Sequence, residues 1–118
     1  MPTTTLYRPV DEKELALIIA SGYSAFPPRL PEQPIFYPVL NEVYARQIAE
    51  RWNTRDGKIG YVTQFQVESV FLQRYPIQTV GSKIHQELWV PAEELAAFNE
   101  HIQGNIEVIV SFVCTYNV

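Results

Sequence analysis

Apolar residues recur along the chain with two spacings, one typical of helices and one typical of strands. Leu15 and Ile18 lie at helical spacing between Asp11, a residue that can cap a helix, and Gly22, a natural helix stop. This pattern predicts a first helix over residues 12–21. Apolar and polar residues then alternate from Ile59 to Glu68, as expected of a strand that is buried on one face.

The same reasoning divides the rest of the chain. Further helices are predicted from about Asn41 to Trp52 and from Pro91 to Gly104, and a short helix or turn at residues 70–72. Further strands are predicted at residues 6–10, 35–39, 83–90 and 105–113. The last of these is rich in Ile, Val and Phe, so we expect a central strand covered on both faces. This order of elements predicts an α+β fold.

Four prolines between residues 23 and 34 prevent both a helix and a central strand in that segment. The segment also carries Phe26, Arg29 and Leu30, so we expect a loop that packs over the domain rather than a free linker. Arg29 itself reads as a solvated loop charge that could touch a phosphate.

Length and composition indicate a single globular domain over residues 1–118. Of the residues, 47% are hydrophobic and 19% are charged, a balance that favours one packed core. The single cysteine, Cys114, rules out an internal disulfide and is expected to be a small buried hydrophobe. We expect a cytoplasmic protein without a membrane partner, because no segment resembles a signal peptide or a membrane span.

Several kinds of chemistry are disfavoured by the residues present. His85 and His101 have no second His or Cys at metal-ligand spacing, so we expect no metal site. Isolated glycines exclude the common phosphate-binding loops. The net charge of −4, without a basic block, makes nucleic acid an improbable partner. Arg and Glu side chains therefore remain as the candidate catalytic or ligand-binding groups.

Three short segments, taken in order, carry the clearest functional signal. The first is Thr5-Leu6-Tyr7-Arg8, followed by an acidic helix start and a helix that ends at Ser21-Gly22. It resembles the opening of the cholera and pertussis toxin catalytic chains, which are mono-ADP-ribosyltransferases. In that family the arginine of the first strand binds a phosphate of NAD, a task that suits the bidentate guanidinium group. The resemblance therefore places Arg8, and Tyr7 beside it, at NAD.

The second and third segments of that family also have counterparts here. Residues 36–39, followed by Tyr44-Ala45, stand where the family has a polar strand and a helix, and Tyr37 would stack on nicotinamide. The strand that begins His85-Gln86-Glu87 and ends at Pro91 resembles the family's Glu-bearing strand. Glu87 would be the catalytic carboxylate, and it would stabilise the cationic ribose as nicotinamide leaves. His85 replaces the first acidic residue and would lie beside the bound NAD.

The resemblance covers roughly residues 5–110 and implies both a fold and an activity. It implies a split, mostly antiparallel sheet with about three flanking helices, around a cleft that binds NAD as substrate and no metal. The implied activity is NAD-dependent mono-ADP-ribosyl transfer, for example to a protein acceptor, or NAD cleavage. The chain also resembles short bacterial proteins labelled "ADP-ribosylation/crystallin J1". That label denotes a large helical glycohydrolase with clustered aspartates, whereas this chain has only Asp11 and Asp56.

Other interpretations of the same residues stay open at this stage. The domain could be a non-catalytic module on the same fold that binds a nucleotide or a protein, or a structural partner protein, for example a homodimer, without a small-molecule site. Arg8 could pair with Asp11 or Glu12. Glu87 and His85 could be exposed strand residues, and Tyr37 a core or rim aromatic. Trp52 and Trp89 are expected to be packing anchors.

Overall fold

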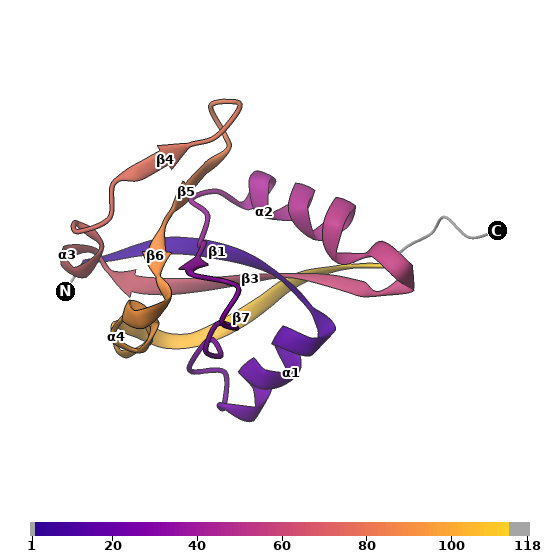
Figure 1. Ribbon diagram of the computed structural model, residues 1–118, viewed down its shortest axis with the longest axis horizontal. Coiled ribbons are helices and arrows are strands. Elements are labelled where there is room, and N and C mark those ends of the chain that lie inside the picture. The colour runs from indigo at the N-terminus through magenta and orange to yellow at the C-terminus, as the bar shows by residue number, and fades with distance from the viewer. Residues whose placement is uncertain (1, 114–118) are drawn as a thin grey trace.

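An antiparallel sheet of three long strands runs through the middle of the protein, in the order β1-β3-β7 (Figure 1). The computed structural model describes residues 2–113, except for the side chain of Asp56, so the expected burial of Cys114 lies outside the described residues. Two shorter pairs of strands, β2 with β6 and β4 with β5, are also antiparallel. The mixture of helices with antiparallel sheets confirms the α+β class.

The strands have the following bounds: β1 Thr3–Asp11, β2 Ile35–Phe36, β3 Ile59–Glu68, β4 Ile77–Thr79, β5 Gln86–Leu88, β6 Val90–Pro91 and β7 Ile102–Val113. The α-helices are α1 Glu12–Ala20, α2 Glu42–Ile48, α3 Ser69–Leu72 and α4 Leu95–Glu100. A π-helical turn, Ala49–Asn53, extends α2, and 3₁₀ turns cover Arg55–Gly57 and Ala92–Glu94. Helices α1, α2 and α4 lie where the sequence predicts helices, and α3 is the short helix expected near residue 70.

Two predicted capping residues start their helices as expected. The Asp11 side chain accepts a hydrogen bond of 2.8 Å from the backbone N–H of Glu14, and Asn41 accepts one of the same length from Tyr44. Each bond satisfies an N–H group that has no partner within the first turn. Asn41 also donates from Nδ2 to the carbonyl oxygen of Ile84, which ties the start of α2 to the segment that leads into β5.

The sheet carries a hydrophobic core on each face. Helices α1, α3 and α4 and the proline-rich loop cover one face, where aromatic rings dominate: Phe26, Phe36, Phe65, Phe71 and Phe98. Helix α2 covers the other face with a smaller cluster built on Val39, Ala45, Ala49 and Val62. Figure 1 shows α2 on one side of the sheet and α1 with α4 on the opposite side.

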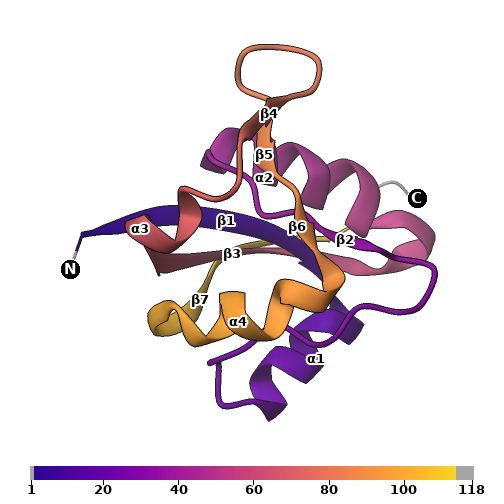
Figure 2. The same ribbon diagram turned by 60° about the vertical axis from the view of Figure 1, so that its left-hand side comes forward.

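Val39 links the central sheet to the β4–β5 hairpin, and its neighbours Pro38 and Leu40 form backbone hydrogen bonds with β5. Val39 forms antiparallel bridges to Tyr7 in β1 and to Glu87 in β5. The bridge to Tyr7 is tight, because the two residues exchange backbone hydrogen bonds of 2.9 and 2.8 Å. Beyond this junction the hairpin projects from the body of the protein, as both ribbon views show (Figures 1 and 2).

The prediction that residues 105–113 form a central strand is wrong. Within the described residues β7 pairs only with β3, so β3 is central and β7 lies at the edge. The apolar run in β7 does not mark a central strand. Register shifts in the pairing of β7 with β3 let its apolar side chains pack in both hydrophobic cores. Ile106 belongs to the large aromatic cluster, whereas Ile109 and Phe112 pack beside α2.

Three predicted boundaries also differ from the structure. The strand expected at 35–39 is reduced to β2 and the Val39 bridge, because Pro38 lacks the N–H group that a continuous ladder needs. The strand expected at 83–90 is shortened to β5 and β6. Helix α4 ends at Glu100, before Gly104, whose φ of +78° places it instead in an irregular part of β7. No helix within residues 2–113 has both the length and the apolar character to cross a membrane.

Candidate functional site

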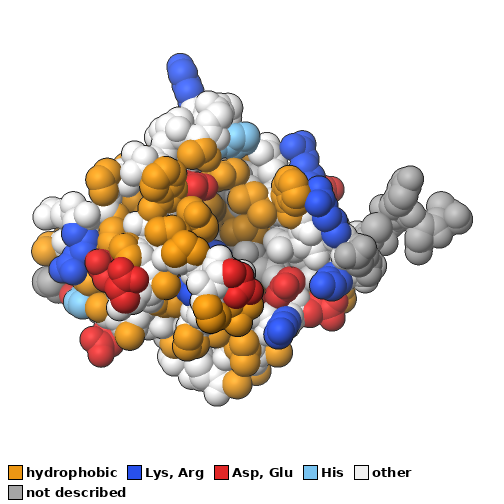
Figure 3. Space-filling model, in the orientation of Figure 1, with side chains coloured by type: hydrophobic (Ala, Val, Ile, Leu, Met, Phe, Trp, Pro, Cys, Tyr) orange, Lys and Arg blue, Asp and Glu red, His pale blue; other side chains and the backbone are white. Residues whose placement is uncertain are grey.

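A cleft of about 410 Å³ opens beside the Val39 junction, where β1 and β5 bridge to the same segment. Its walls come from β1, the segment after β2, the end of α2, and β5 with the residue that follows it. The lining residues are Arg8, Pro9, Tyr37, Val39, Ile48, Glu87 and Trp89. Hydrophobic side chains gather over the middle of this side of the molecule (Figure 3). The cleft is therefore mostly apolar, with one arginine and one carboxylate, a composition typical of small-molecule sites.

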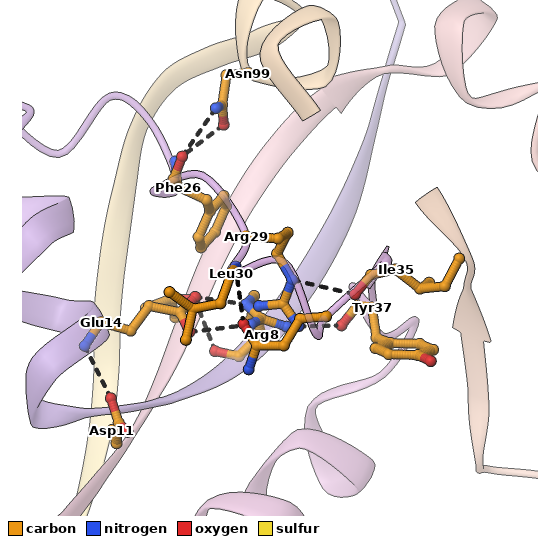
Figure 4. A network of polar contacts seen from close by, with 11 residues as sticks. Arg8, Asp11, Glu14, Phe26, Arg29, Leu30, Ile35, Tyr37 and Asn99 are labelled. Carbon is orange, nitrogen blue, oxygen red and sulfur yellow. Dashed lines mark hydrogen bonds and ion pairs between the residues drawn. The ribbon is translucent and has the colours of Figure 1, made fainter. Parts of the chain in front are cut away.

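Arg8 is 8% exposed and is held in a fixed position. Its Nε and Nη2 donate to the two carboxylate oxygens of Glu14 at 2.7 and 3.0 Å, and its Nη1 donates to the Tyr37 carbonyl oxygen at 3.3 Å (Figure 4). The guanidinium carbon lies 4.6 Å from the centre of the Phe36 ring. The partner is Glu14 rather than Asp11 or Glu12, because Asp11 caps α1 and Glu12 accepts a hydrogen bond from the Ile59 N–H.

Glu87 has a neutral donor on each carboxylate oxygen. The Tyr44 hydroxyl donates to Oε2 at 2.9 Å, and the Trp89 Nε1–H donates to Oε1 at 2.8 Å. Within the described residues no cation forms an ion pair with it. Its charge is therefore oriented by hydrogen bonds but not neutralised, which leaves it able to stabilise a positive charge in the cleft.

His85 and Tyr44 form a support behind Glu87. The His85 ring stacks on the Tyr44 ring at 4.6 Å, and His85 Nε2 lies 3.0 Å from Gln47 Oε1. The alternation of side chains predicts His85 on the same strand face as Glu87, but His85 lies just before β5 and does not line the cleft. Its contact with Glu87 runs through the Tyr44 ring and hydroxyl.

Tyr7 and Tyr37 lie in different surroundings. The Tyr7 ring packs against the smaller core, on the face of β1 opposite to Arg8, and does not line the cleft. Tyr37 lines the cleft and is 40% exposed, so its ring is accessible to a ligand. The structure thus brings Arg8, Tyr37 and Glu87 together in the cleft, whereas Tyr7 and His85 do not line it.

Neither tryptophan is a packing anchor, contrary to expectation. Trp89 is 44% exposed and forms one wall of the cleft. Trp52 is also exposed and stacks against the Arg55 guanidinium at 3.7 Å. Trp89 could have been found from the sequence, because it stands two residues after Glu87 and a strand repeats its direction every two residues. No sequence pattern points to Tyr44, because its contact with Glu87 joins residues that are 43 positions apart.

Burial, followed by the hydrogen bond to Glu87, raises the pKa of Tyr44 from 10.0 to about 12. The unfolded chain therefore loses this proton at lower pH than the folded protein does, and the free energy of unfolding should fall as the pH rises from about 10 to about 12. Burial and Glu94 raise the pKa of Tyr75 as well, which adds to the same decline.

Tyr44→Phe isolates the part of this decline that belongs to Tyr44. We expect the stability difference between the wild type and Tyr44→Phe to be constant below about pH 10 and to shrink above it. Urea unfolding at a series of pH values measures this difference. A difference that does not change up to the most alkaline value would contradict the assignment.

The described residues contain no group of three or more His, Cys, Asp or Glu side chains placed to hold a metal ion. No protein-family model matches the chain, and searches of curated proteins and of solved structures also give no match.

Proposed function

We propose that the cleft binds NAD and cleaves its bond between nicotinamide and ribose, with transfer of the ADP-ribosyl group to an acceptor or to water. The observation that carries this proposal is the convergence of Arg8, Tyr37 and Glu87 on one cleft, although they lie in three distant parts of the sequence. These are the residues that the resemblance to the toxin-type ADP-ribosyltransferases assigns to phosphate binding, stacking and catalysis. The split-sheet fold of that family is part of the same proposal.

Glu87 would act on the ribose. When the bond between the ribose C1′ and the nicotinamide nitrogen breaks, the electron pair leaves with nicotinamide and a positive charge develops on the sugar. A carboxylate held by Tyr44 and Trp89 can stabilise this charge without reorganisation, and it can accept a hydrogen bond from the 2′-hydroxyl group. The acceptor then bonds to C1′ and releases a proton.

Tyr37 and Trp89 would hold the nicotinamide ring. Both aromatic side chains line the cleft and are partly exposed. The nicotinamide ring of NAD is cationic, so an electron-rich aromatic face attracts it. The released nicotinamide is neutral and loses this attraction, which favours its departure. A volume of about 410 Å³ fits the nicotinamide end of NAD rather than the whole dinucleotide.

Release of nicotinamide from NAD by the purified protein tests this function directly. We expect release by the wild type and weaker NAD binding by Arg8→Ala, because the arginine borders the cleft and keeps terminal N–H groups that can reach a phosphate. Arg46→Ala is the matched control, since Arg46 is an exposed arginine paired with Glu42 on α2. Calorimetry gives the affinity, and chromatography gives the nicotinamide. If the wild type neither binds NAD nor releases nicotinamide, the proposed function is wrong.

A second candidate, a non-catalytic nucleotide-binding module, is favoured by one observation. Arg8 already pairs with both oxygens of Glu14, so a ligand phosphate would have to compete for this arginine. Such a module would bind NAD or a related nucleotide in a calorimetric titration and would release no nicotinamide on prolonged incubation.

A further inference from the structure

Arg29 differs from the solvated loop charge that the sequence suggests. Its side chain is only partly exposed, and its Nε donates to the Ile35 carbonyl oxygen at 3.1 Å (Figure 4). This bond leaves the two terminal nitrogens of the guanidinium group, which carry four N–H donors. Within the described residues these nitrogens have no ion-pair partner.

The loop that carries Arg29 is fastened at both ends. The Phe26 ring is buried in the aromatic core, and its backbone exchanges two hydrogen bonds of 3.0 Å with the Asn99 side chain. At the other end, the Ala92 N–H donates to the Pro34 carbonyl oxygen at 2.8 Å. Several prolines between these points restrict the backbone further. The position of Arg29 is therefore set by the fold before any ligand arrives.

Charge around Arg29 is unbalanced. Arg8 pairs with both oxygens of Glu14, so the carboxylate whose charge also acts on Arg29 is already paired. Burial, and next the charge of Arg8, lower the pKa of the Arg29 guanidinium, while Glu14 opposes this effect. Two cations thus share one carboxylate, and an incoming anion would relieve their repulsion.

A second hollow, of about 150 Å³, lies next to this pair. Its lining residues are Asp11, Lys13, Glu14, Leu17, Pro27, Pro28, Arg29, Leu30 and Gln33. Because Glu14 lines this hollow and Arg8 lines the larger cleft, their ion pair stands between the two. Lys13 and Arg29 face Asp11 and Glu14 across this hollow, and Glu14 is already paired with Arg8, which lines the larger cleft. The site has room for phosphate groups but not for a whole nucleoside.

We propose that Arg29 is a diphosphate-binding residue, and that it holds the pyrophosphate of a nucleotide whose other end occupies the Glu87 cleft. A guanidinium group binds phosphate oxygens in bidentate fashion, and here it is held in place by the loop. The assignment of that nucleotide as NAD rests on the proposed function, whereas the anion site itself does not.

Calorimetric titration with inorganic pyrophosphate tests the anion site without reference to catalysis. We expect the wild type to bind pyrophosphate and Arg29→Ala to bind it at least about 10-fold more weakly, because charge-assisted hydrogen bonds are lost. Arg29→Lys should fall between them, since it keeps the charge but not the fork. Arg51→Ala, which removes an exposed arginine from the π-helical turn after α2, should bind like the wild type.

Glu14→Gln gives an effect of opposite sign. It removes the competing negative charge and keeps the shape of the side chain, so pyrophosphate should bind more tightly than to the wild type. The thermal unfolding of each variant is followed alongside, so that only folded protein is compared.

Two results would overturn the assignment: no binding of pyrophosphate to the wild type, or equal binding by the wild type and Arg29→Ala. Either result together with nicotinamide release would leave the proposed function intact and remove only Arg29. Conversely, pyrophosphate binding that depends on Arg29, without any nicotinamide release, would support the anion site and count against NAD cleavage.

Discussion

Glu87→Gln should slow nicotinamide release strongly while NAD still binds. Gln has the shape of Glu, and its amide can accept from Trp89 Nε1–H through the oxygen and donate to the Tyr44 hydroxyl through the nitrogen. The fold and the cleft are therefore retained, and only the negative charge beside the developing ribose cation is lost. We expect the turnover rate to fall about 100-fold or more, as for other groups that stabilise transition-state charge.

Glu93→Gln is the matched control for this experiment. Glu93 is an exposed carboxylate at the turn before α4 and lines neither the Glu87 cleft nor the hollow beside Arg29. It should release nicotinamide at the rate of the wild type. If Glu87→Gln releases nicotinamide as fast as Glu93→Gln does, Glu87 has no catalytic role, and the cleft needs another interpretation.

Phe36→Ala should destabilise the protein more than any of the site substitutions does. Phe36 is fully buried, its ring lies 5.1 Å from that of Phe26 and 5.3 Å from that of Phe98, and the Arg8 guanidinium rests on it. Removing the ring leaves a cavity where the core meets the site. The free energy of unfolding is expected to fall by about 3–5 kcal/mol, measured by urea denaturation.

Phe36→Leu separates the volume of this side chain from its aromatic contacts. Leu refills most of the space, so the expected loss is below about 1.5 kcal/mol. A loss of under about 1 kcal/mol for Phe36→Ala would mean that its neighbours collapse into the space, contrary to the close packing of the surrounding rings.

The elements that can be predicted are those whose signal is local. The caps of α1 and α2 depend on Asp11 and Asn41 and on an N–H group three residues later, so short-range chemistry is sufficient to locate them. The alternation in β3 is also readable, because one face of that strand packs on the large core. The order of strands is not readable: an apolar run marks burial but not hydrogen-bonded neighbours, and the prediction for β7 is wrong for that reason.

The candidate site shows the same division. The family resemblance selects Arg8, Tyr37 and Glu87 and implies that they share a cleft, but no periodicity or spacing in the sequence brings them together. That depends on Val39, which bridges to both β1 and β5. The role of Tyr44 depends on a contact across 43 positions, and the ion pair of Arg8 depends on the direction in which α1 leaves β1. Arg29 resembles a loop charge in the sequence because its constraint comes from Ile35 and, through the loop, from Asn99.

The sequence by itself determined the α+β class, the positions of the principal helices and the residue types available for chemistry. These follow from periodicity, capping and composition, which act over a few residues. The tertiary structure alone decided which strand is central, which aromatic rings are exposed, and which carboxylate pairs with which arginine. Those outcomes depend on contacts between residues far apart in the chain, and such contacts are fixed only when the two faces of the sheet are packed.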